Sequence, residues 1–228
     1  MACLDVGCGG GDVAFELARL VEPGGRVVAL DFDEVKLEIA RAEANAQQIH
    51  NIEFQTANLD ECELPSGFDL VHARFVLQHL QDPARTLVEM RKALKPGGVV
   101  VVADTDFRGL FSEPDSPTIR RLVELYSQTL RRRGGDPNLG VRLPALLAQS
   151  GFENVRASVI QNAAIEGETK LIVPMTLENS AEAVVAEGVA SREEVDAVVS
   201  EAYEFARDPS TLLSGPRIIQ TFAFRPAE

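Results

Sequence analysis

The sequence has few cysteines, no long apolar segment and a shortage of basic residues, and each lack argues against a class of protein. Its three cysteines, Cys3, Cys8 and Cys62, are too few and too irregularly spaced for a disulfide framework or a zinc site. No apolar run approaches the roughly 18–20 residues that a membrane helix needs. The N-terminus also lacks the basic and apolar regions of a secretory signal. We therefore expect a cytoplasmic protein without a membrane partner.

The balance of charge is strongly acidic. Lys and Arg number 22 against 35 Asp and Glu, which gives a formal net charge of −13. Binding to a phosphate backbone depends on basic side chains, so we expect no nucleic acid partner. The one basic cluster, Arg131–Arg133, ends a predicted helix, where positive charge complements the helix dipole. A length of 228 residues suits one domain with a substantial core.

Short β-branched runs alternate with helical stretches over the first two-thirds of the chain. This rhythm predicts βαβ units and a parallel sheet with helices on both faces. The predicted strands are Ala2–Val6, Arg26–Asp31, Ile52–Thr56, Phe68–Ala73 and Gly98–Asp104. The predicted helices between them are Val13–Leu20, Glu34–Gln48 and Pro83–Leu94.

The rhythm changes after Asp104. The pattern predicts a long helix over Pro114–Arg133 and a short one over Leu143–Ser150. It then predicts a strand over Val155–Ala164 and one or two helices within Ala181–Ala206. Arg217–Phe224 is the candidate for a final strand.

A glycine-rich segment follows the first predicted strand. Gly7 and Gly9 fit the first two positions of the dinucleotide fingerprint, but its third glycine position is Asp12. An acid at a helix start would repel a pyrophosphate, which normally binds at that positive end. Asp5 ends an otherwise apolar strand, and burying its carboxylate is costly unless a cation or hydrogen-bond donors meet it. A cofactor with an ammonium group, a sulfonium and no phosphate would supply that partner.

With these features the segment resembles the first motif of class I S-adenosylmethionine-dependent methyltransferases, of the small-molecule type. The resemblance implies that Asp5 orients the methionine end of the cofactor, with Gly7 and Gly9 in the turn beside it. It implies that Asp31 holds the ribose hydroxyls and that Phe32 lies near the adenine. An acid at the position of Asp31 also binds ribose in dehydrogenases, so it indicates a ribosyl cofactor without deciding which. Its alternative role is to cap the following helix, although Asp33 could do this instead.

Two later motifs extend the resemblance. Ala57–Asp60 occupies the position of the adenine-edge motif, and Asn58 stands where the family usually has Asp, with Leu59 beside it. Phe68–Leu80 resembles the fourth-strand motif, which implies that Arg74 borders the methionine part of the cofactor. The family's turn before the fifth strand is matched by Lys95–Gly98.

The resemblance also implies the fold. It predicts a Rossmann-like seven-stranded mixed sheet in the order 3-2-1-4-5-7-6, with the last strand antiparallel. We expect a single methyltransferase domain over residues 1–228. Within it, residues 1–106 would form the cofactor-binding core, and residues 107–228 would supply substrate-covering helices and the last two strands.

Methyl transfer is a displacement in which the protein mainly aligns the reacting groups. A general base is needed only for a protonated acceptor. His79 is the candidate, since it lies just past the fourth strand and has an ordinary pKa near 6.5. Its alternative role is packing against the cofactor or capping a helix. His72 lies inside a strand, which favours a structural role.

The acceptor is expected to be a small organic molecule, because no Asn/Asp-Pro-Pro-aromatic string and no Pro-Cys pair of nucleobase methylation is present. The family generally has helices before its first strand, and this chain opens on that strand. We therefore expect either a partner subunit, as in a homodimer, or an open cofactor. Two alternatives remain: an NAD-dependent oxidoreductase, and a non-catalytic binding protein that keeps the cofactor fold.

Overall fold

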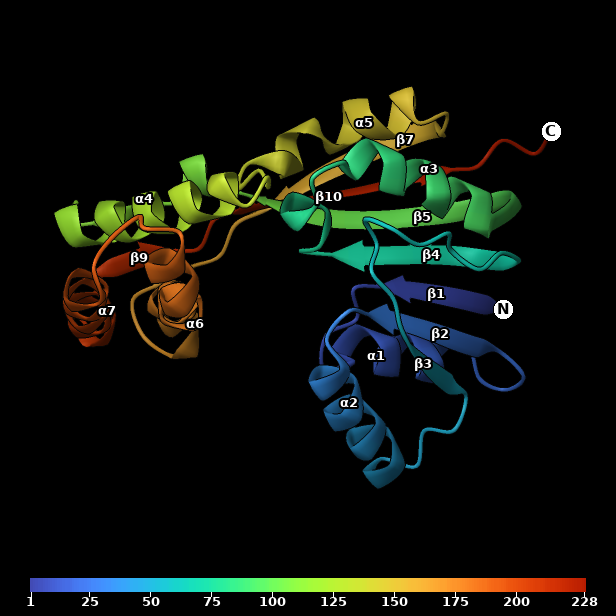
Figure 1. The fold of residues 1–228 in the computed structure, drawn as a ribbon, viewed down its shortest axis with the longest axis horizontal. Coiled ribbons are helices and arrows are strands. Elements are labelled where there is room, and N and C mark those ends of the chain that lie inside the picture. Colours follow the sequence, from blue (N-terminus) through green and yellow to red (C-terminus); the bar gives the residue numbers. More distant parts are fainter. The chain divides into compact units, whose positions relative to one another are not determined.

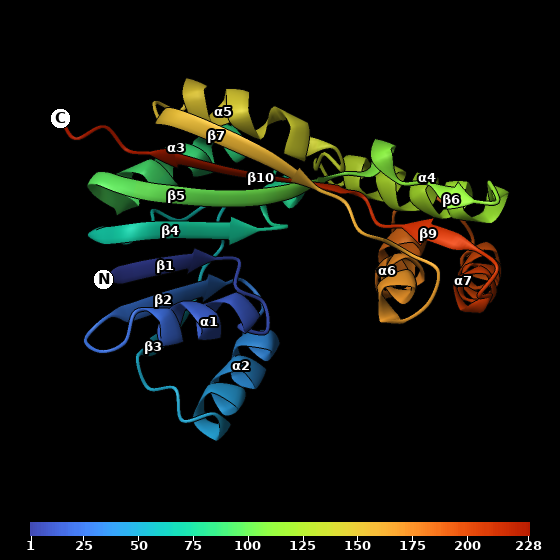
Figure 2. The same ribbon diagram turned by 180° about the vertical axis from the view of Figure 1, so that it is seen from behind.

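The computed structural model describes residues 1–228, and its main feature is the expected seven-stranded mixed sheet. The strands follow the order β3-β2-β1-β4-β5-β10-β7, which matches the predicted order because β10 and β7 are the last two strands of this sheet. Strand β10 runs opposite to β4 and β5 (Figures 1 and 2). The strands of this sheet are β1 (Ala2–Val6), β2 (Arg26–Asp31), β3 (Ile52–Thr56), β4 (Phe68–Arg74), β5 (Leu94–Asp106), β7 (Glu153–Ile160) and β10 (Arg217–Phe224).

The chain divides into two compact units. The first, called here the sheet unit, comprises residues 1–104, 142–158 and 220–228. The second, called here the helical unit, comprises residues 105–141 and 159–219.

Three helices of the sheet unit connect its parallel strands: α1 (Asp12–Leu20), α2 (Glu34–Ala46) and α3 (Pro83–Ala93). Right-handed crossovers place α1 and α2 on one face and α3 on the other, because the strand order reverses between β1 and β4. A fourth helix, α5 (Leu143–Gln149), packs against α3. A short 3₁₀ helix, η1 (Leu77–His79), follows β4.

Local sequence explains where these helices start. The side chain of Asp33 accepts hydrogen bonds from the main-chain N–H groups of Val35 and Lys36, so it is the N-cap of α2. Asp82 caps α3 in the same way, with Pro83 in the first turn. The predicted bounds of β1, β2, β3 and β10 are confirmed, and the other predicted bounds in this unit lie within four residues of the observed ones.

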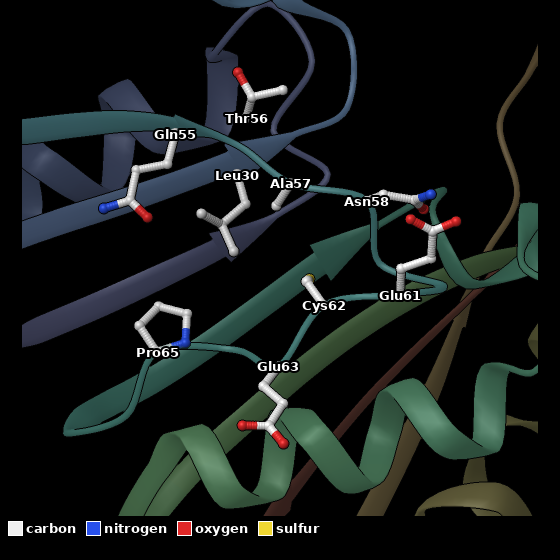
Figure 3. A pocket seen from close by; sticks show the side chains of 9 residues that line it. All are labelled: Leu30, Gln55, Thr56, Ala57, Asn58, Glu61, Cys62, Glu63 and Pro65. Atoms are coloured by element: carbon white, nitrogen blue, oxygen red, sulfur yellow. The ribbon is translucent and has the colours of Figure 1, made fainter.

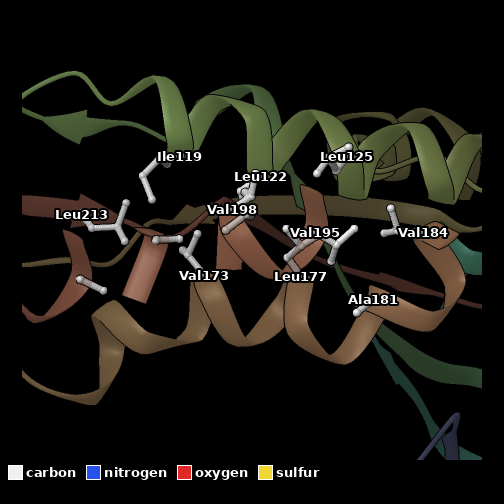
Figure 4. Packing of buried hydrophobic residues seen from close by; sticks show 12 residues of the cluster. Ile119, Leu122, Leu125, Val173, Leu177, Ala181, Val184, Val195, Val198 and Leu213 are labelled. Atoms are coloured by element: carbon white, nitrogen blue, oxygen red, sulfur yellow. The ribbon is translucent and has the colours of Figure 1, made fainter. Parts of the chain in front are cut away.

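The helical unit is built around α4, α6 and α7, whose facing side chains form one hydrophobic cluster (Figure 4). The cluster includes Leu122 and Leu125 of α4, Leu177 of α6 and Val195 of α7, all fully buried. A three-stranded antiparallel sheet, in the order β6-β9-β8, lies in the same unit. The helices of the helical unit are α4 (Pro117–Arg132), α6 (Ile172–Ala186) and α7 (Arg192–Arg207), and its short strands are β6 (Ser112–Glu113), β8 (Ala163–Ala164) and β9 (Leu212–Ser214). Its 3₁₀ helices are η2 (Phe107–Gly109), η3 (Leu139–Arg142) and η4 (Glu168–Leu171). The last residue of η3 belongs to the sheet unit.

Two predictions for this part of the chain are corrected by the structure. The strand predicted over Val155–Ala164 is two strands, β7 and β8, which belong to different sheets. Helix α6 begins at Ile172, earlier than the predicted Ala181, because Pro174 lies in its first turn, where the missing N–H group has no intrahelical partner. No helix of the structure is both long and apolar enough to cross a membrane.

Candidate cofactor site

The turn between β1 and α1 is shaped by glycines with positive φ. Gly7 has a φ of 71°, and a Cβ atom there would lie 2.3 Å from Cγ2 of Val76, so only glycine fits. Gly9 has a φ of 54°, but a Cβ atom there would meet nothing within 4 Å. The main chain at Gly9 therefore faces open space, where a ligand can approach it closely.

Asp5 is buried beside this turn and is only half satisfied by the protein. Its Oδ1 atom lies 2.7 Å from Nδ1 of His72, and the side chain is 2% exposed. Its Oδ2 atom is buried and has no hydrogen-bond partner. His72 thus meets part of the cost of burying the carboxylate, and the second oxygen is left for another donor. The parallel register, which places Asp5 opposite His72, brings these two residues together.

A cavity of about 210 Å³ lies at this turn, at the carboxyl ends of β1 and β4. This is the point where the strand order reverses and where open α/β sheets bind ligands. The residues that line it are Asp5, Gly7, Cys8, Gly9, Gly10, Asp12, Val13, His72, Arg74 and Phe75. The structure therefore brings four of the predicted cofactor residues together here: Asp5, Gly7, Gly9 and Arg74.

Arg74 and Phe75 close the β4 side of this cavity. The Arg74 guanidinium lies 5.5 Å from the centre of the Phe75 ring, within the range of a cation–π contact. Phe75 has a φ of 59°, an uncommon and strained value for an aromatic residue. Strain of this kind persists where the surrounding structure demands it, often at a ligand site.

Asp31 connects the end of β2 to the glycine turn. Its Oδ2 atom accepts a hydrogen bond of 2.8 Å from the main-chain N–H of Gly9, and its Oδ1 atom accepts one of 3.0 Å from that of Asp33. Because Asp33 caps α2, Asp31 is not the helix cap. The side chain is 7% exposed, so this second carboxylate is also largely removed from water.

A second cavity, of about 400 Å³, follows β3 (Figure 3). Asn58 and Glu61 lie at one end of it and Pro65 at the other (Figure 3). The Oδ1 atom of Asn58 accepts a hydrogen bond from the main-chain N–H of Asp60, while its Nδ2 group has no partner and remains free to donate. The remaining lining residues are Leu30, Gln55, Thr56, Ala57, Cys62 and Glu63.

The other predicted site residues line neither cavity. Phe32 is 73% exposed at the end of β2, and Leu59 is half-buried next to Asn58. His79 ends η1 and is only partly covered by the protein, and its Nε2 atom lies 3.4 Å from Nε2 of Gln78. The surrounding protein lowers the pKa of His79 by desolvating its charged form, and Lys36 adds to this effect.

Sequence reasoning missed the buried acids near the end of β5, Asp104 and Asp106, of which Asp104 lies in the sheet unit. Burial raises the pKa of Asp104 from 3.8 to about 8, against hydrogen bonds from the main-chain N–H groups of Gln78 and Leu77. Its Oδ1 atom has no partner. The available signal was an acid at the end of an apolar strand, the same signal that singled out Asp5 and Asp31. The role of His72 depended on strand register, which no local pattern reveals.

Solved structures share this fold. Phosphoethanolamine N-methyltransferase 2 of Haemonchus contortus, in complex with S-adenosyl-L-methionine, is 21% identical with a TM-score of 0.60, covering 99% of this chain and 49% of that one. The (4+2)-cyclase SpnF is also 21% identical, with a TM-score of 0.61, covering 100% of this chain and 75% of that one. Likeness at this level of identity shows the fold alone.

Sequence comparison defines the class. Residues 1–133, more than half of the chain, match the family described as "Methyltransferase domain", and the chain belongs to this family. A demethylmenaquinone methyltransferase of Lactococcus lactis is 38% identical over 127 residues, which are 55% of this chain and 48% of that protein. An uncharacterized 37.1 kDa protein from Streptomyces fradiae is 31% identical over 153 residues, which are 66% of this chain and 43% of that protein. The chain spans about half the length of the curated relatives it matches.

Proposed function

We propose that this protein binds S-adenosyl-L-methionine and transfers its methyl group to a small organic acceptor. The observation that carries the proposal is the buried Asp5 carboxylate, which has one unpaired oxygen beside an open glycine turn. A cationic ammonium group would satisfy that oxygen, whereas a pyrophosphate would be repelled by Asp5 and by Asp12 in the first turn of α1. The residues present therefore fit a phosphate-free nucleoside cofactor.

Each predicted cofactor residue then has a role that its surroundings support. Asp5 would accept hydrogen bonds from the cofactor ammonium group, and Arg74, in the same cavity, would attract its carboxylate. Gly7 and Gly9 would let the cofactor approach the main chain. Asp31 would accept hydrogen bonds from the ribose hydroxyls.

The adenine would be held at the second cavity. There Asn58 would donate through its free Nδ2 group, and the exposed ring of Phe32 and the neighbouring Leu59 would pack near the base. When bound, the cofactor supplies an electrophilic methyl group on its sulfonium. The protein holds and orients it, and methyl transfer is accelerated mainly by alignment.

We also propose His79 as the base for an acceptor that arrives protonated. Its lowered pKa keeps the imidazole neutral, and so able to accept a proton, at neutral pH. If His79 has this role, His79→Asn should remove the acidic limb of the pH–rate profile with a hydroxyl acceptor. A parallel loss at every pH would instead indicate a structural role.

The remaining assignments complete the proposal. We propose that both units serve a single methyltransferase domain, that the protein acts in the cytoplasm without a nucleic acid partner, and that it forms a homodimer. The three free cysteines support the cytoplasmic location. The net charge of −13 supports the lack of a nucleic acid partner. Light scattering on a gel-filtration column tests the dimer, and a monomer at micromolar concentration would contradict it.

The decisive experiment is calorimetric titration with S-adenosylhomocysteine and, separately, with NADH. We expect binding of the first only, with a loss of affinity of more than about tenfold in Asp5→Asn and in Asp31→Ala. Glu38→Gln, which changes an exposed acid of α2 that makes no hydrogen bond or ion pair, is the matched control and should bind normally. Tighter binding of NADH, or unchanged affinity in both variants, would contradict the proposal.

A methylation assay is needed as well, because the same fold occurs in the cyclase SpnF. Transfer of a labelled methyl group to any member of an acceptor panel supports the enzyme. Binding of S-adenosylhomocysteine without transfer to any acceptor would favour the non-catalytic alternative.

A further inference from the structure

The helical unit contains a cavity of its own, of about 310 Å³. This volume lies at the lower end of the range of small-molecule sites. Most of its wall is apolar and comes from η2 and α4 and the segment between them. The lining residues are Phe107, Arg108, Leu110, Phe111, Ser112, Asp115, Ile119, Arg120 and Val123.

The apolar part of the wall is continuous with the core of the helical unit. Phe107 packs against Tyr126 with ring centres 4.7 Å apart, and Leu110 and Val123 pack against this pair. Phe111, by contrast, is 47% exposed at the cavity. A wall that combines packed apolar side chains with an exposed aromatic ring suits a flat apolar group.

One arginine of the wall is held in place by a buried acid. Asp106 is 0% exposed, and its Oδ1 atom accepts a hydrogen bond of 2.7 Å from Nε of Arg108. Its Oδ2 atom accepts one of 2.7 Å from Nη2 of Arg217. Burial raises the pKa of Asp106, but the two guanidinium groups outweigh this effect and hold the pKa below its usual value. The acid therefore remains charged and anchors both arginines.

The polar groups of the wall differ in what they have left to offer. Arg120 is paired with Asp115, so these two charges satisfy each other. Arg108 uses only Nε, and its two Nη groups make no hydrogen bond. The Ser112 hydroxyl accepts a hydrogen bond of 3.1 Å from the main-chain N–H of Ser116, and its own proton has no acceptor. Apart from the second oxygen of Asp115, whose charge is paired with Arg120, the uncommitted polar groups of the cavity are therefore donors.

We propose that this cavity binds a small amphipathic anion, with an aromatic or other flat apolar body against Phe107 and Phe111 and a carboxylate or phosphate group on Arg108 and Ser112. The inference goes beyond the proposed function, because every residue that lines this cavity belongs to the helical unit. Guanidinium groups with free N–H donors recognise both kinds of oxyanion through charge-assisted hydrogen bonds.

The test uses four probes that share a naphthalene ring: 2-naphthoate, 2-naphthyl phosphate, neutral 2-naphthylmethanol and cationic 2-naphthylmethylamine. Their dissociation constants are measured on the full chain by fluorescence and by ligand-observed NMR. We expect at least one of the two anions to bind about tenfold or more tightly than the neutral and cationic probes. The preference between the two anions shows whether the cavity favours a carboxylate or a phosphate ester. Equal binding of all four probes would overturn the proposal.

Variants then locate the binding. Arg108→Gln should remove the advantage of the anions and leave the neutral probe unchanged, whereas Phe111→Ser should weaken all the probes that bind. Phe111 is half exposed, so its replacement should leave the fold intact, which circular dichroism checks. Arg131→Gln, which changes an exposed arginine of α4 outside the cavity, is the matched control. Binding that is insensitive to both Arg108→Gln and Phe111→Ser would overturn the proposal.

A titration with S-adenosylhomocysteine on the same samples separates this inference from the proposed function. If S-adenosylhomocysteine binds and no anionic probe does, the cavity assignment fails and the proposed function stands. If the anions bind as expected and S-adenosylhomocysteine does not, the cavity assignment stands and the proposed function fails.

Discussion

Asp104 offers the sharpest test of the physical reasoning applied to this structure. The side chain is 1% exposed, one of its oxygens has no partner, and burial raises its pKa from 3.8 to about 8. Asp104→Asn replaces it with a neutral side chain of nearly the same shape. The amide oxygen can still accept the hydrogen bond of 3.3 Å from the main-chain N–H of Gln78. The substitution thus removes the titration and keeps the packing.

The sign and size of the effect follow from linkage. Between pH 3.8 and about 8 the unfolded chain has lost this proton while the folded chain retains it, so the contribution of Asp104 to stability falls as pH rises. The slope is about 1.4 kcal/mol per pH unit. We therefore expect the free energy of unfolding of Asp104→Asn, relative to the natural chain, to increase by roughly 2–3 kcal/mol between pH 5 and pH 7. Above about pH 8 the difference should level off.

The assay is urea unfolding of both proteins at a series of pH values, followed by circular dichroism. Contributions from all other titrating groups cancel in the difference between the two proteins. Glu38→Gln, with an exposed acid changed in the same way, should show a difference that does not vary with pH. If the difference for Asp104→Asn is equally flat, the acid is charged in the folded protein and the burial argument is refuted.

Three further predictions concern other parts of the molecule. Gly9→Ala should fold, but calorimetry should show a loss of more than about tenfold in its affinity for S-adenosylhomocysteine. The control is Gly24→Ala, which should bind normally, because Gly24 also has a positive φ and open space around it but lies in another turn. Equal affinities of the two variants would contradict the open-turn argument. Lys170→Met should lower the free energy of unfolding by about 3 kcal/mol or more. The buried ammonium group of Lys170 has three N–H donors within hydrogen-bond distance of four oxygens, namely the main-chain oxygens of Ile165, Asp208 and Thr211 and the Thr211 hydroxyl. The exposed Lys92→Met should change the free energy of unfolding by less than about 1 kcal/mol in the same urea assay, and a similarly small change in Lys170→Met would show that this cage is dispensable. In Asp31→Asn one oxygen acceptor is kept, so S-adenosylhomocysteine affinity should fall less than in Asp31→Ala, and equal losses would contradict a hydrogen-bonding role.

The comparison between prediction and structure separates two kinds of information. Strands β1 to β5 and β10, the glycine turn and the availability of Asp33 as a helix cap were predicted, since their signals lie within a few residues of one another. The strand order was predicted only through family resemblance. The early start of α6 and the splitting of β7 from β8 were not predicted, because the local pattern there is weak and tertiary packing decided the outcome.

The sequence by itself determined that acids stand at the ends of strands and that a glycine-rich turn follows the first strand. Tertiary structure decided what those acids meet. The pairing of Asp5 with His72 joins residues 67 positions apart, through a strand register that no short-range pattern encodes. The burial of Asp104 and the free donors of Arg108 likewise depend on which distant side chains exclude water or neutralise charge. Desolvation and pairing are properties of the folded surroundings, and they are what turns a carboxylate or a guanidinium group into a candidate site.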